Sequence, residues 1–309
     1  MKQTILGAGG AIGIELAAEL SGYTKDIRLV GRNPRQVNPS DEVFKADLSD
    51  RWQVFKAIEG SSIVYLTVGF EYNIAIWQVQ WPLLIRNVID ACLEYGAKLV
   101  FFDNVYAIGG DNVKHITEES PFSPVSKKGE VRMQVDQTIL DSIGNRNLEA
   151  IIARAPDFFS DIKGKSLTMN LIYDNLLNDK EAAWLCNAEV IHSVGYTPEL
   201  AKGTAILGNT NDAYGQIWNL PTDPQPVTGA EWIRLFAAEM GKSDKFQLLS
   251  ADTIKELGAA DQILKEIYEM LYQYDRDYYF DSSKFNKRFN YTPLTNALAV
   301  KQTVERLAQ

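Results

Sequence analysis

Cysteine and histidine are scarce in this sequence of 309 residues. The two cysteines, Cys92 and Cys186, lie far apart in apolar surroundings, and no Cys-x-x-Cys pair occurs. The two histidines, His115 and His192, are also far apart, so a zinc-type cluster of His and Cys ligands is not expected. Without a disulfide framework, we expect the reducing conditions of the cytoplasm.

Basic residues and long apolar runs are also lacking. The 40 acidic residues outnumber the 31 lysines and arginines, which gives a formal net charge of −9. This balance argues against general binding to nucleic acid or to an anionic membrane, because both need clustered basic residues. No apolar run approaches the roughly 18–20 residues of a membrane span. Because a strand pattern begins at Thr4, we expect no signal peptide. With nucleic acid and membrane not expected as partners, we expect a small-molecule substrate.

Strand patterns alternate with helix patterns in the first half of the sequence. Apolar residues recur at helical spacing over 12–20, 76–93 and 131–143. The intervening strand candidates are Thr4–Leu6, Ile27–Val30, Val43–Lys45, Ile63–Leu66, Leu99–Phe102 and Ala150–Ala153. This alternation predicts an α/β fold with a doubly wound parallel sheet and right-handed crossovers.

A glycine-rich turn joins the first strand to the first helix. Gly7 allows a tight turn, Gly9 or Gly10 allows a phosphate to approach the backbone, and Gly13 allows the helix to pack against the strand. The start of the helix offers free N–H groups and a positive dipole end to a pyrophosphate. The pattern predicts a Rossmann-like dinucleotide site, and the alternative is a turn kept for packing. The expected contacts are Gly7, Gly9, Gly10, Ala11, Ile12 and Gly13.

The end of the second strand indicates which cofactor binds. Arg32 stands where enzymes that use NAD usually have Asp or Glu, and a guanidinium suits the 2′-phosphate of NADP. We therefore expect NADP rather than NAD, although a solvated arginine is the alternative. Asp47 follows the third strand, where it is placed either to contact adenine or to cap the next helix. Leu48 and Thr67 are further expected cofactor contacts.

The alternation is lost in the second half. Helix patterns occur at 228–240, 250–257, 259–272 and 294–307, and short strand candidates at 190–194 and 216–220. We therefore expect a dinucleotide-binding domain over residues 1–160, with strands near 186–196 and 216–220 returning to its sheet. Residues 161–309 are expected to form a smaller, mainly helical substrate domain.

Several segments carry a family resemblance. They are GAGGAIG at 7–13, ADL at 46–48, LTVG at 66–69, FDNVYAIG at 102–109, TEESPFSP at 117–124 and RAPDFF at 154–159. Together they resemble the extended short-chain dehydrogenase/reductase superfamily, which contains sugar-nucleotide epimerases, dehydratases and related reductases. Two further segments, EMLYQY at 269–274 and FDSSKF at 280–285, resemble an atypical branch that is like NAD-dependent epimerases/dehydratases.

The resemblance implies a catalytic Ser or Thr after the fifth strand and a Tyr-x-x-x-Lys motif on the next helix. All three positions differ in this sequence, because alignment places Asn104, Lys128 and Arg132 there. Arg132 is expected to hold ribose hydroxyls, and Asn104 to orient a carbonyl. The Lys128 amine is a candidate general acid or base, a Schiff-base former, or a group that only faces cofactor or substrate.

Two other residues are candidates for the site. Tyr106 is the phenol nearest to Asn104 and is either the missing proton donor or a packing residue. Asp157, after the sixth strand, is either a carboxylate of the substrate cleft or a cap or ion-pair partner. His192 alternates with apolar residues, so a strand histidine bonded to a backbone carbonyl is expected.

These observations predict an NADP(H)-binding oxidoreductase or epimerase/dehydratase with an altered catalytic triad. Its substrate would be a small carbonyl or hydroxyl compound or a sugar nucleotide. A non-catalytic NADP(H) sensor or protein-interaction module is the alternative. The resemblance also implies a homodimer through the helices at 76–93 and 131–143.

Overall fold

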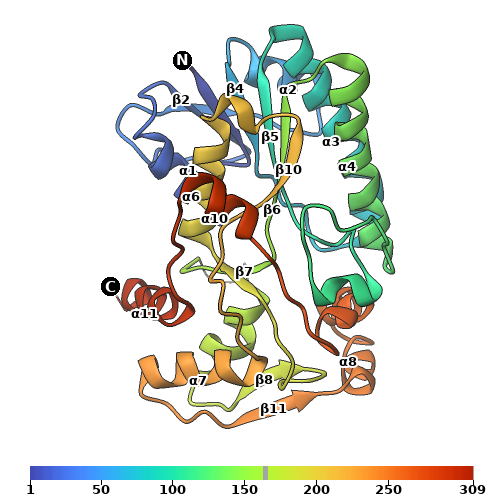
Figure 1. Cartoon of the computed structure of the whole chain (residues 1–309), viewed down its shortest axis with the longest axis vertical. Coiled ribbons are helices and arrows are strands. Elements are labelled where there is room, and N and C mark those ends of the chain that lie inside the picture. The colour runs from blue at the N-terminus through green and yellow to red at the C-terminus, as the bar shows by residue number, and fades with distance from the viewer. Residues whose placement is uncertain (163–165, 309) are drawn as a thin grey trace. The chain divides into compact units, whose positions relative to one another are not determined.

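The computed structural model describes residues 1–162 and 166–308, and the chain divides into two compact units (Figure 1). Unit 1 comprises Met1–Ala107, Lys128–Ala155 and Leu200–Leu220. Unit 2 comprises Ile108–Lys127, Pro156–Glu199 and Pro221–Gln309. The return of residues 200–220 to unit 1 accords with the strand expected near 216–220, whereas residues 108–127 and 156–160, expected in the dinucleotide-binding domain, belong to unit 2. Unit 2 is nearly as long as unit 1 because it takes in the segment 108–127 as well as most of the second half.

Unit 1 is built on a sheet of seven strands in the order β10-β6-β5-β4-β1-β2-β3, and every neighbouring pair is parallel. The strands are β1 (Gln3–Leu6), β2 (Ile27–Gly31), β3 (Glu42–Lys45), β4 (Ile63–Leu66), β5 (Lys98–Asp103), β6 (Ala150–Arg154) and β10 (Gln216–Asn219). The doubly wound parallel sheet is confirmed. The strand order reverses between β1 and β4, and ligands of such sheets bind at the carboxyl ends beside this point.

Helices cover both faces of this sheet. On one face, α2 (Arg51–Ile58), α3 (Ile74–Tyr95) and α4 (Lys127–Arg146) share one apolar core with the strands. In Figure 1, α3 and α4 run side by side. On the other face lie α1 (Ala11–Leu20) and α6 (Thr197–Gly208), and Tyr65 of β4 contacts Asn209 just after α6. Val64 and Leu66, on either side of Tyr65, belong to the core of the first face. Successive side chains of a strand point to opposite faces of the sheet, so Tyr65 lies on the other face.

Unit 2 contains two small parallel pairs of strands. One pair joins β7 (Asp157–Phe159) to β9 (Val194–Tyr196), and the other joins β8 (Ala182–Leu185) to β11 (Phe246–Leu249). The strand expected near 186–196 therefore does not return to the main sheet. It pairs with β7 instead, where the Phe159 and Tyr196 rings stack with centroids 5.4 Å apart. Of the two expected returning strands, β10 alone joins the sheet of unit 1.

The remaining elements of unit 2 are mostly short. They are α5 (Asp174–Leu177), α7 (Gly229–Met240), α8 (Ala251–Leu257), α9 (Gln262–Ile267), α10 (Ser283–Phe289) and α11 (Asn296–Leu307), with single turns at Gly110–Lys114, Met169–Tyr173 and Tyr268–Gln273. The helix expected over 259–272 is thus an α-helix followed by a 3₁₀ segment. Among the helices of residues 1–162 and 166–308, none has both the length and the apolar content that a membrane crossing requires.

Candidate functional site

The glycine turn between β1 and α1 is packed tightly on one side and open on the other. Gly7 has φ of +97°, and a Cβ there would lie 2.8 Å from the Val68 backbone nitrogen. A Cβ on Gly13 would lie 2.7 Å from the Gly7 carbonyl oxygen, so neither position accepts a side chain without movement. At Gly9, by contrast, a Cβ would meet nothing within 4 Å. The turn therefore fits a group that approaches the backbone at Gly9, as a pyrophosphate does.

The start of α1 is suited to an anion. Gly10 is the N-cap residue, and no side chain of the described residues hydrogen-bonds at this cap. The first turn, which begins with Ala11, Ile12 and Gly13, has no acidic residue. The helix dipole and the N–H groups of this turn therefore favour negative charge.

Thr67 has a local role in the structure. Its hydroxyl donates to the Leu6 carbonyl oxygen at 3.2 Å, and its backbone N–H donates to the same oxygen at 2.8 Å. Thr67 therefore ties the loop after β4 to the end of β1, directly beside the glycine turn. A contact of Thr67 with the cofactor stays a prediction.

Arg32 and Asp47 lie at the carboxyl ends of β2 and β3. Both are exposed, and Arg35 is exposed as well. Hydrogen bonds from the backbone and side chain of Ser49 lower the pKa of Asp47, and the charge of Arg32 adds to this effect. The N-cap of α2 is Asp50, whose carboxylate accepts from the Gln53 backbone at 2.9 Å, so Asp47 does not cap that helix. Leu48, which follows Asp47 in the sequence, is half-buried.

Lys128 and Tyr106 are brought together by a third residue, Tyr72. Lys128 is fully buried, and its Nζ lies 4.7 Å from the centroid of the Tyr72 ring. The Tyr72 hydroxyl donates to the Tyr106 hydroxyl at 3.4 Å. The Trp77 ring stacks on the Tyr106 ring and makes an edge-to-face contact with the Tyr72 ring. Tyr72 was missed by the sequence analysis, where its only signal was an aromatic residue in the loop after the fourth strand.

Asn104 and Arg132 have partners within unit 1. The Asn104 side-chain oxygen accepts from the Tyr106 backbone N–H at 3.0 Å, so Asn104 shapes the turn that carries Tyr106. The buried Arg132 guanidinium forms an ion pair with Asp103 and lies 4.3 Å from the Trp81 ring centroid. The structure therefore anchors Arg132 in the core, and its contact with a ribose stays a prediction.

Asp157 and His192 meet within unit 2. One carboxylate oxygen of Asp157 accepts from the Tyr274 hydroxyl at 2.6 Å and lies 3.1 Å from His192 Nε2. His192 Nδ1 faces the Gln273 carbonyl at 3.1 Å, and the ring is stacked between Tyr274 and Tyr278. His192 is thus bonded to a backbone carbonyl as expected, and its second partner is Asp157. Asp157 is thus a hydrogen-bond partner of His192 and Tyr274, and a role toward substrate stays a prediction.

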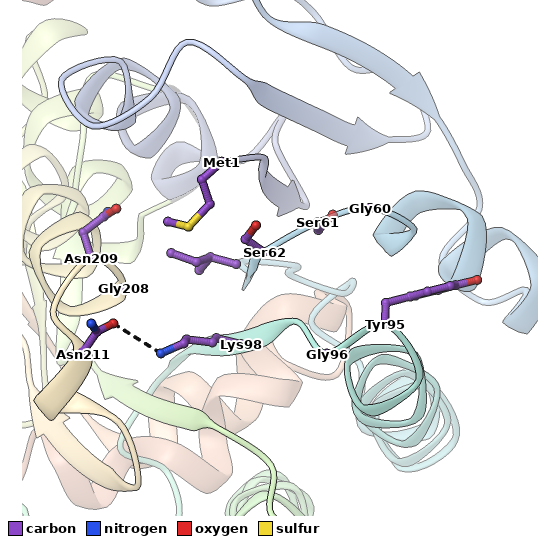
Figure 2. Close-up of a pocket in the computed structure, with 11 residues that line it drawn as sticks. Met1, Gly60, Ser61, Ser62, Tyr95, Gly96, Lys98, Gly208, Asn209 and Asn211 are labelled. Atoms are coloured by element: carbon purple, nitrogen blue, oxygen red, sulfur yellow. Dashed lines mark hydrogen bonds between the residues drawn. The ribbon is translucent and has the colours of Figure 1, made fainter.

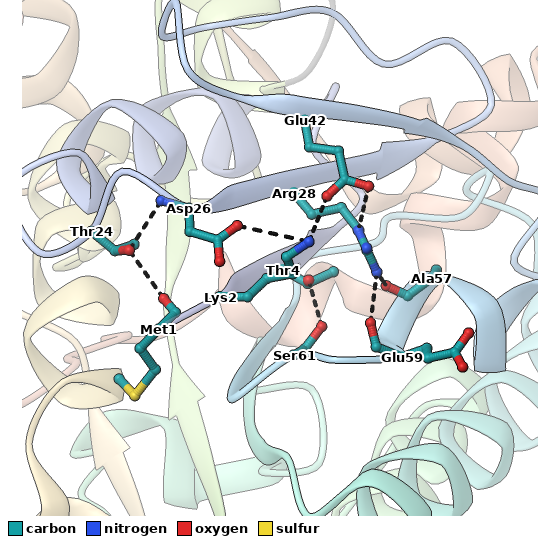
Figure 3. A network of polar contacts seen from close by, with 10 residues as sticks. All are labelled: Met1, Lys2, Thr4, Thr24, Asp26, Arg28, Glu42, Ala57, Glu59 and Ser61. Carbon is teal, nitrogen blue, oxygen red and sulfur yellow. Dashed lines mark hydrogen bonds and ion pairs between the residues drawn. The ribbon is translucent and has the colours of Figure 1, made fainter.

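A cavity of about 430 Å³ lies at the opposite edge of the sheet (Figure 2). It is lined by residues around the amino ends of β4 and β5, among them Ser62, Lys98 and Asn211, and Lys98 Nζ donates to Asn211 at 3.3 Å. Nearby strands are tied by ion pairs of Glu42 with Lys2 and Arg28 (Figure 3). Ion pairs between neighbouring strands thus lie at this amino edge. The glycine turn, Arg32 and the group of Tyr72, Tyr106 and Lys128 lie at the carboxyl edge.

Comparison with known proteins agrees with this geometry. A family described as NAD(P)H-binding matches residues 7–141. A UDP-glucose 4-epimerase of Lactobacillus helveticus is 24% identical over 153 residues, which are 44% of this chain and 46% of that protein. A 3β-hydroxysteroid-dehydrogenase/decarboxylase isoform 2 of Arabidopsis thaliana is 25% identical over 126 residues, 38% of this chain and 22% of that protein. The match therefore spans less than half the length of these relatives.

Solved structures match over the whole chain. The UDP-glucose 4-epimerase of Thermus thermophilus, in complex with NAD, has a TM-score of 0.79 at 15% identity and covers 100% of this chain and 99% of its own. The dTDP-glucose 4,6-dehydratase DesIV of Streptomyces venezuelae, with NAD and TYD bound, also has a TM-score of 0.79 at 15% identity, covering 99% and 96%. Residues 7–141 are therefore similar to an NAD(P)H-binding family, and the chain has the same fold as these epimerase and dehydratase structures.

Proposed function

We propose that this protein is an NADP(H)-dependent oxidoreductase or epimerase/dehydratase that acts on a small carbonyl or hydroxyl compound or a sugar nucleotide. The observation that carries the proposal is the glycine turn, which is open at Gly9 beside the uncapped start of α1. The presence of Arg32 at the end of the neighbouring strand supports NADP over NAD, because a guanidinium can bind a phosphate through two parallel hydrogen bonds.

Each part of the cofactor has candidate contacts at the carboxyl edge of the sheet. The turn at Gly7, Gly9 and Gly10 and the first N–H groups of α1 would hold the pyrophosphate. Arg32 would hold the 2′-phosphate, and Asp47 and Leu48 would lie near the adenine. The bound cofactor would supply or accept a hydride. The chain must then position the reacting carbon and move one proton to or from the substrate oxygen.

The proton transfer would rely on an altered triad. We propose that Asn104, Lys128 and Arg132 replace the Ser/Thr, Tyr and Lys of related enzymes at the same places. The pKa of an arginine guanidinium is too high for the group to act as an acid at neutral pH. Because the Arg132 guanidinium is also paired with Asp103, we propose an electrostatic role for it. A Schiff base at Lys128 would be supported by borohydride trapping of a carbonyl compound on that residue.

A second candidate function is supported by the same three residues. If neither these three residues nor Tyr106 beside them moves a proton, the protein would bind NADP(H) without turnover, as a sensor or protein-interaction module. NADPH binding without reduction of any carbonyl compound in a broad screen would favour this second function. Reduction of even one compound, with loss of the reaction in a Tyr106→Phe variant, would favour the enzyme.

The cofactor assignment is tested by an Arg32→Asp variant. We expect it to weaken NADPH binding far more than NADH binding, since only NADPH carries the 2′-phosphate. Lys25→Asp is the matched control, because it changes the charge by the same amount near the amino end of β2. Equal losses for both cofactors in Arg32→Asp would contradict the 2′-phosphate assignment.

The predicted homodimer through α3 and α4 is also kept as a proposal. The side chain of Val79 on α3 is 62% exposed, whereas Trp77 and Trp81 of the same helix are buried within unit 1. The two tryptophans therefore pack inside the protomer, and Val79 is the residue to replace by Glu in a sedimentation test of self-association.

A further inference from the structure

Three side chains from different elements meet beside the proposed cofactor turn. Tyr72 lies in the loop after β4, Tyr106 in the loop after β5, and Lys128 in the first turn of α4. Because β4 and β5 are parallel neighbours, their loops leave the same edge of the sheet. The backbone of the loop after β4 also touches the glycine turn, where Val68 would contact a Cβ on Gly7.

The contacts among these three side chains connect the Lys128 amine to the Tyr106 hydroxyl through Tyr72. The Lys128 Nζ is directed at the Tyr72 ring, 4.7 Å from its centroid, and Lys128 is 0% exposed. An ammonium over an aromatic face is attracted by the ring, and the attraction grows when the ring gains negative charge. Burial strengthens this interaction because water does not screen it.

The second link joins the two phenols. Tyr72 donates its hydroxyl hydrogen to the Tyr106 oxygen. If Tyr106 gives up its own proton, the resulting phenolate oxygen keeps the hydrogen bond from Tyr72, and hydrogen bonds to charged groups are stronger than those to neutral ones. The hydrogen bond from Tyr72 would therefore stabilise the phenolate that Tyr106 becomes when it donates its proton.

We propose that Tyr106 is the catalytic proton donor and that Tyr72 and Lys128 are its positioning residues. This inference rests on the proposed NADP(H)-dependent function. In the reduction direction, the carbonyl carbon receives a hydride from NADPH, which leaves as NADP⁺, and the carbonyl oxygen receives the proton of the Tyr106 hydroxyl. The O–H bond of Tyr106 breaks, the O–H bond of the product alcohol forms, and Tyr106 later recovers a proton from solvent.

The other groups near this cluster do not take over this role. Trp77 of α3 packs against both phenols and carries no charge. Asp103 and Arg132, on β5 and α4, are paired with each other. Asn104 holds the Tyr106 backbone through its side-chain oxygen and has no acidic proton to give. Among the contacts described for residues 1–162 and 166–308, the titratable groups that meet here include the two phenols and the Lys128 amine.

The test is a ¹³C NMR titration of protein labelled at the tyrosine Cζ, without cofactor. The Tyr106 signal is assigned by its loss in Tyr106→Phe, and Tyr23→Phe on the surface is the control. We expect its titration midpoint to rise by about one pH unit in Tyr72→Phe and in Lys128→Met, as loss of stabilisation of a charged group predicts. Lys128→Arg keeps the cation and should restore most of the wild-type midpoint. Equal midpoints in wild type, Tyr72→Phe and Lys128→Met would overturn the proposal.

A second arm tests proton donation itself. With NADPH and 4-nitrobenzaldehyde as the carbonyl probe, we expect Tyr106→Phe to reduce the probe at least about 100-fold more slowly than wild type. Its NADPH binding by calorimetry should be unchanged. A wild-type rate in Tyr106→Phe would contradict the assignment. Failure of wild type to bind NADPH would instead overturn the proposed function, whereas the titration reports on the phenols without cofactor.

Discussion

The guanidinium of Arg132 is paired with the carboxylate of Asp103 in the interior of unit 1, where their side chains are 3% and 0% exposed. Asp136 and Arg154 lie beside them and form a second buried pair at 3.4 Å. Two acids and two arginines therefore share one water-excluded site at the carboxyl ends of β5 and β6. Burial of charges is costly, and removal of one partner leaves the other without compensation.

The two acids of this site should respond differently to substitution. Burial, followed by the charge of Asp103, raises the pKa of Asp136 well above its ordinary range. A raised pKa favours the protonated form of Asp136, so we expect Asp136→Asn to cost less than about 1 kcal/mol of unfolding free energy because it keeps a neutral donor there. Asp103→Asn leaves the Arg132 charge unpaired and should cost about 3–5 kcal/mol. Urea unfolding at pH 7 measures both, and equal losses would show that Asp136 is ionised.

Stability should also depend on pH through Asp136. Above the ordinary pKa of an aspartate, near 4, the unfolded state has lost a proton that folded Asp136 still holds. Folding stability then falls as pH rises, by up to about 1.4 kcal/mol per pH unit, until folded Asp136 also ionises. Asp136→Asn has no such proton, so its stability relative to wild type should improve between pH 5 and pH 7. A difference in unfolding free energy that stays constant over this range would contradict the assignment.

The glycine turn allows folding and cofactor binding to be separated. Gly9→Ala places its methyl group in open space and should fold with a loss below about 1 kcal/mol, yet it should weaken NADPH binding by crowding the phosphates. Gly7→Ala must adopt φ of +97° against the Val68 backbone, so it should lower stability by more than about 1 kcal/mol. Thermal unfolding and calorimetric NADPH titration test the pair. Unchanged NADPH affinity in Gly9→Ala would mean that the open side of the turn is not the phosphate site.

Local sequence signals predicted the sheet and the tight glycine turn, whereas long-range contacts decided the rest. The strands β1 to β6 were predictable because short buried runs with β-branched residues alternate with helical patterns, and Gly7 and Gly13 occupy positions where a Cβ would collide. The partner of β9 was not predictable, since a three-residue strand carries no signal that selects β7 over the main sheet. Tyr72 was missed for a similar reason. Its importance comes from Lys128, 56 residues further on, and no local pattern records that contact.

In unit 2, the hydrogen bonds of His192 and Asp157 predict how two substitutions change the free energy of unfolding. His192→Phe keeps the stacking between Tyr274 and Tyr278 but leaves the Gln273 carbonyl without its ring donor and removes one partner of Asp157. We expect a loss of about 1–3 kcal/mol of unfolding free energy, at the upper end of this range, because a buried acceptor is left unsatisfied. Tyr274→Phe removes one hydrogen bond and leaves His192 on Asp157, so about 1 kcal/mol is expected. Urea unfolding compares the two variants, and a larger loss in Tyr274→Phe would contradict this view of the cluster.

Calorimetric titration of the purified protein with NADPH, NADP, NADH and NAD, side by side, is the most direct measurement. If Arg32 receives the 2′-phosphate and the glycine turn receives the pyrophosphate, NADPH and NADP bind, and each binds more tightly than its counterpart without the phosphate. Equal or tighter binding of NADH and NAD would contradict the role of Arg32. Absence of binding by all four would contradict the proposed function as a whole.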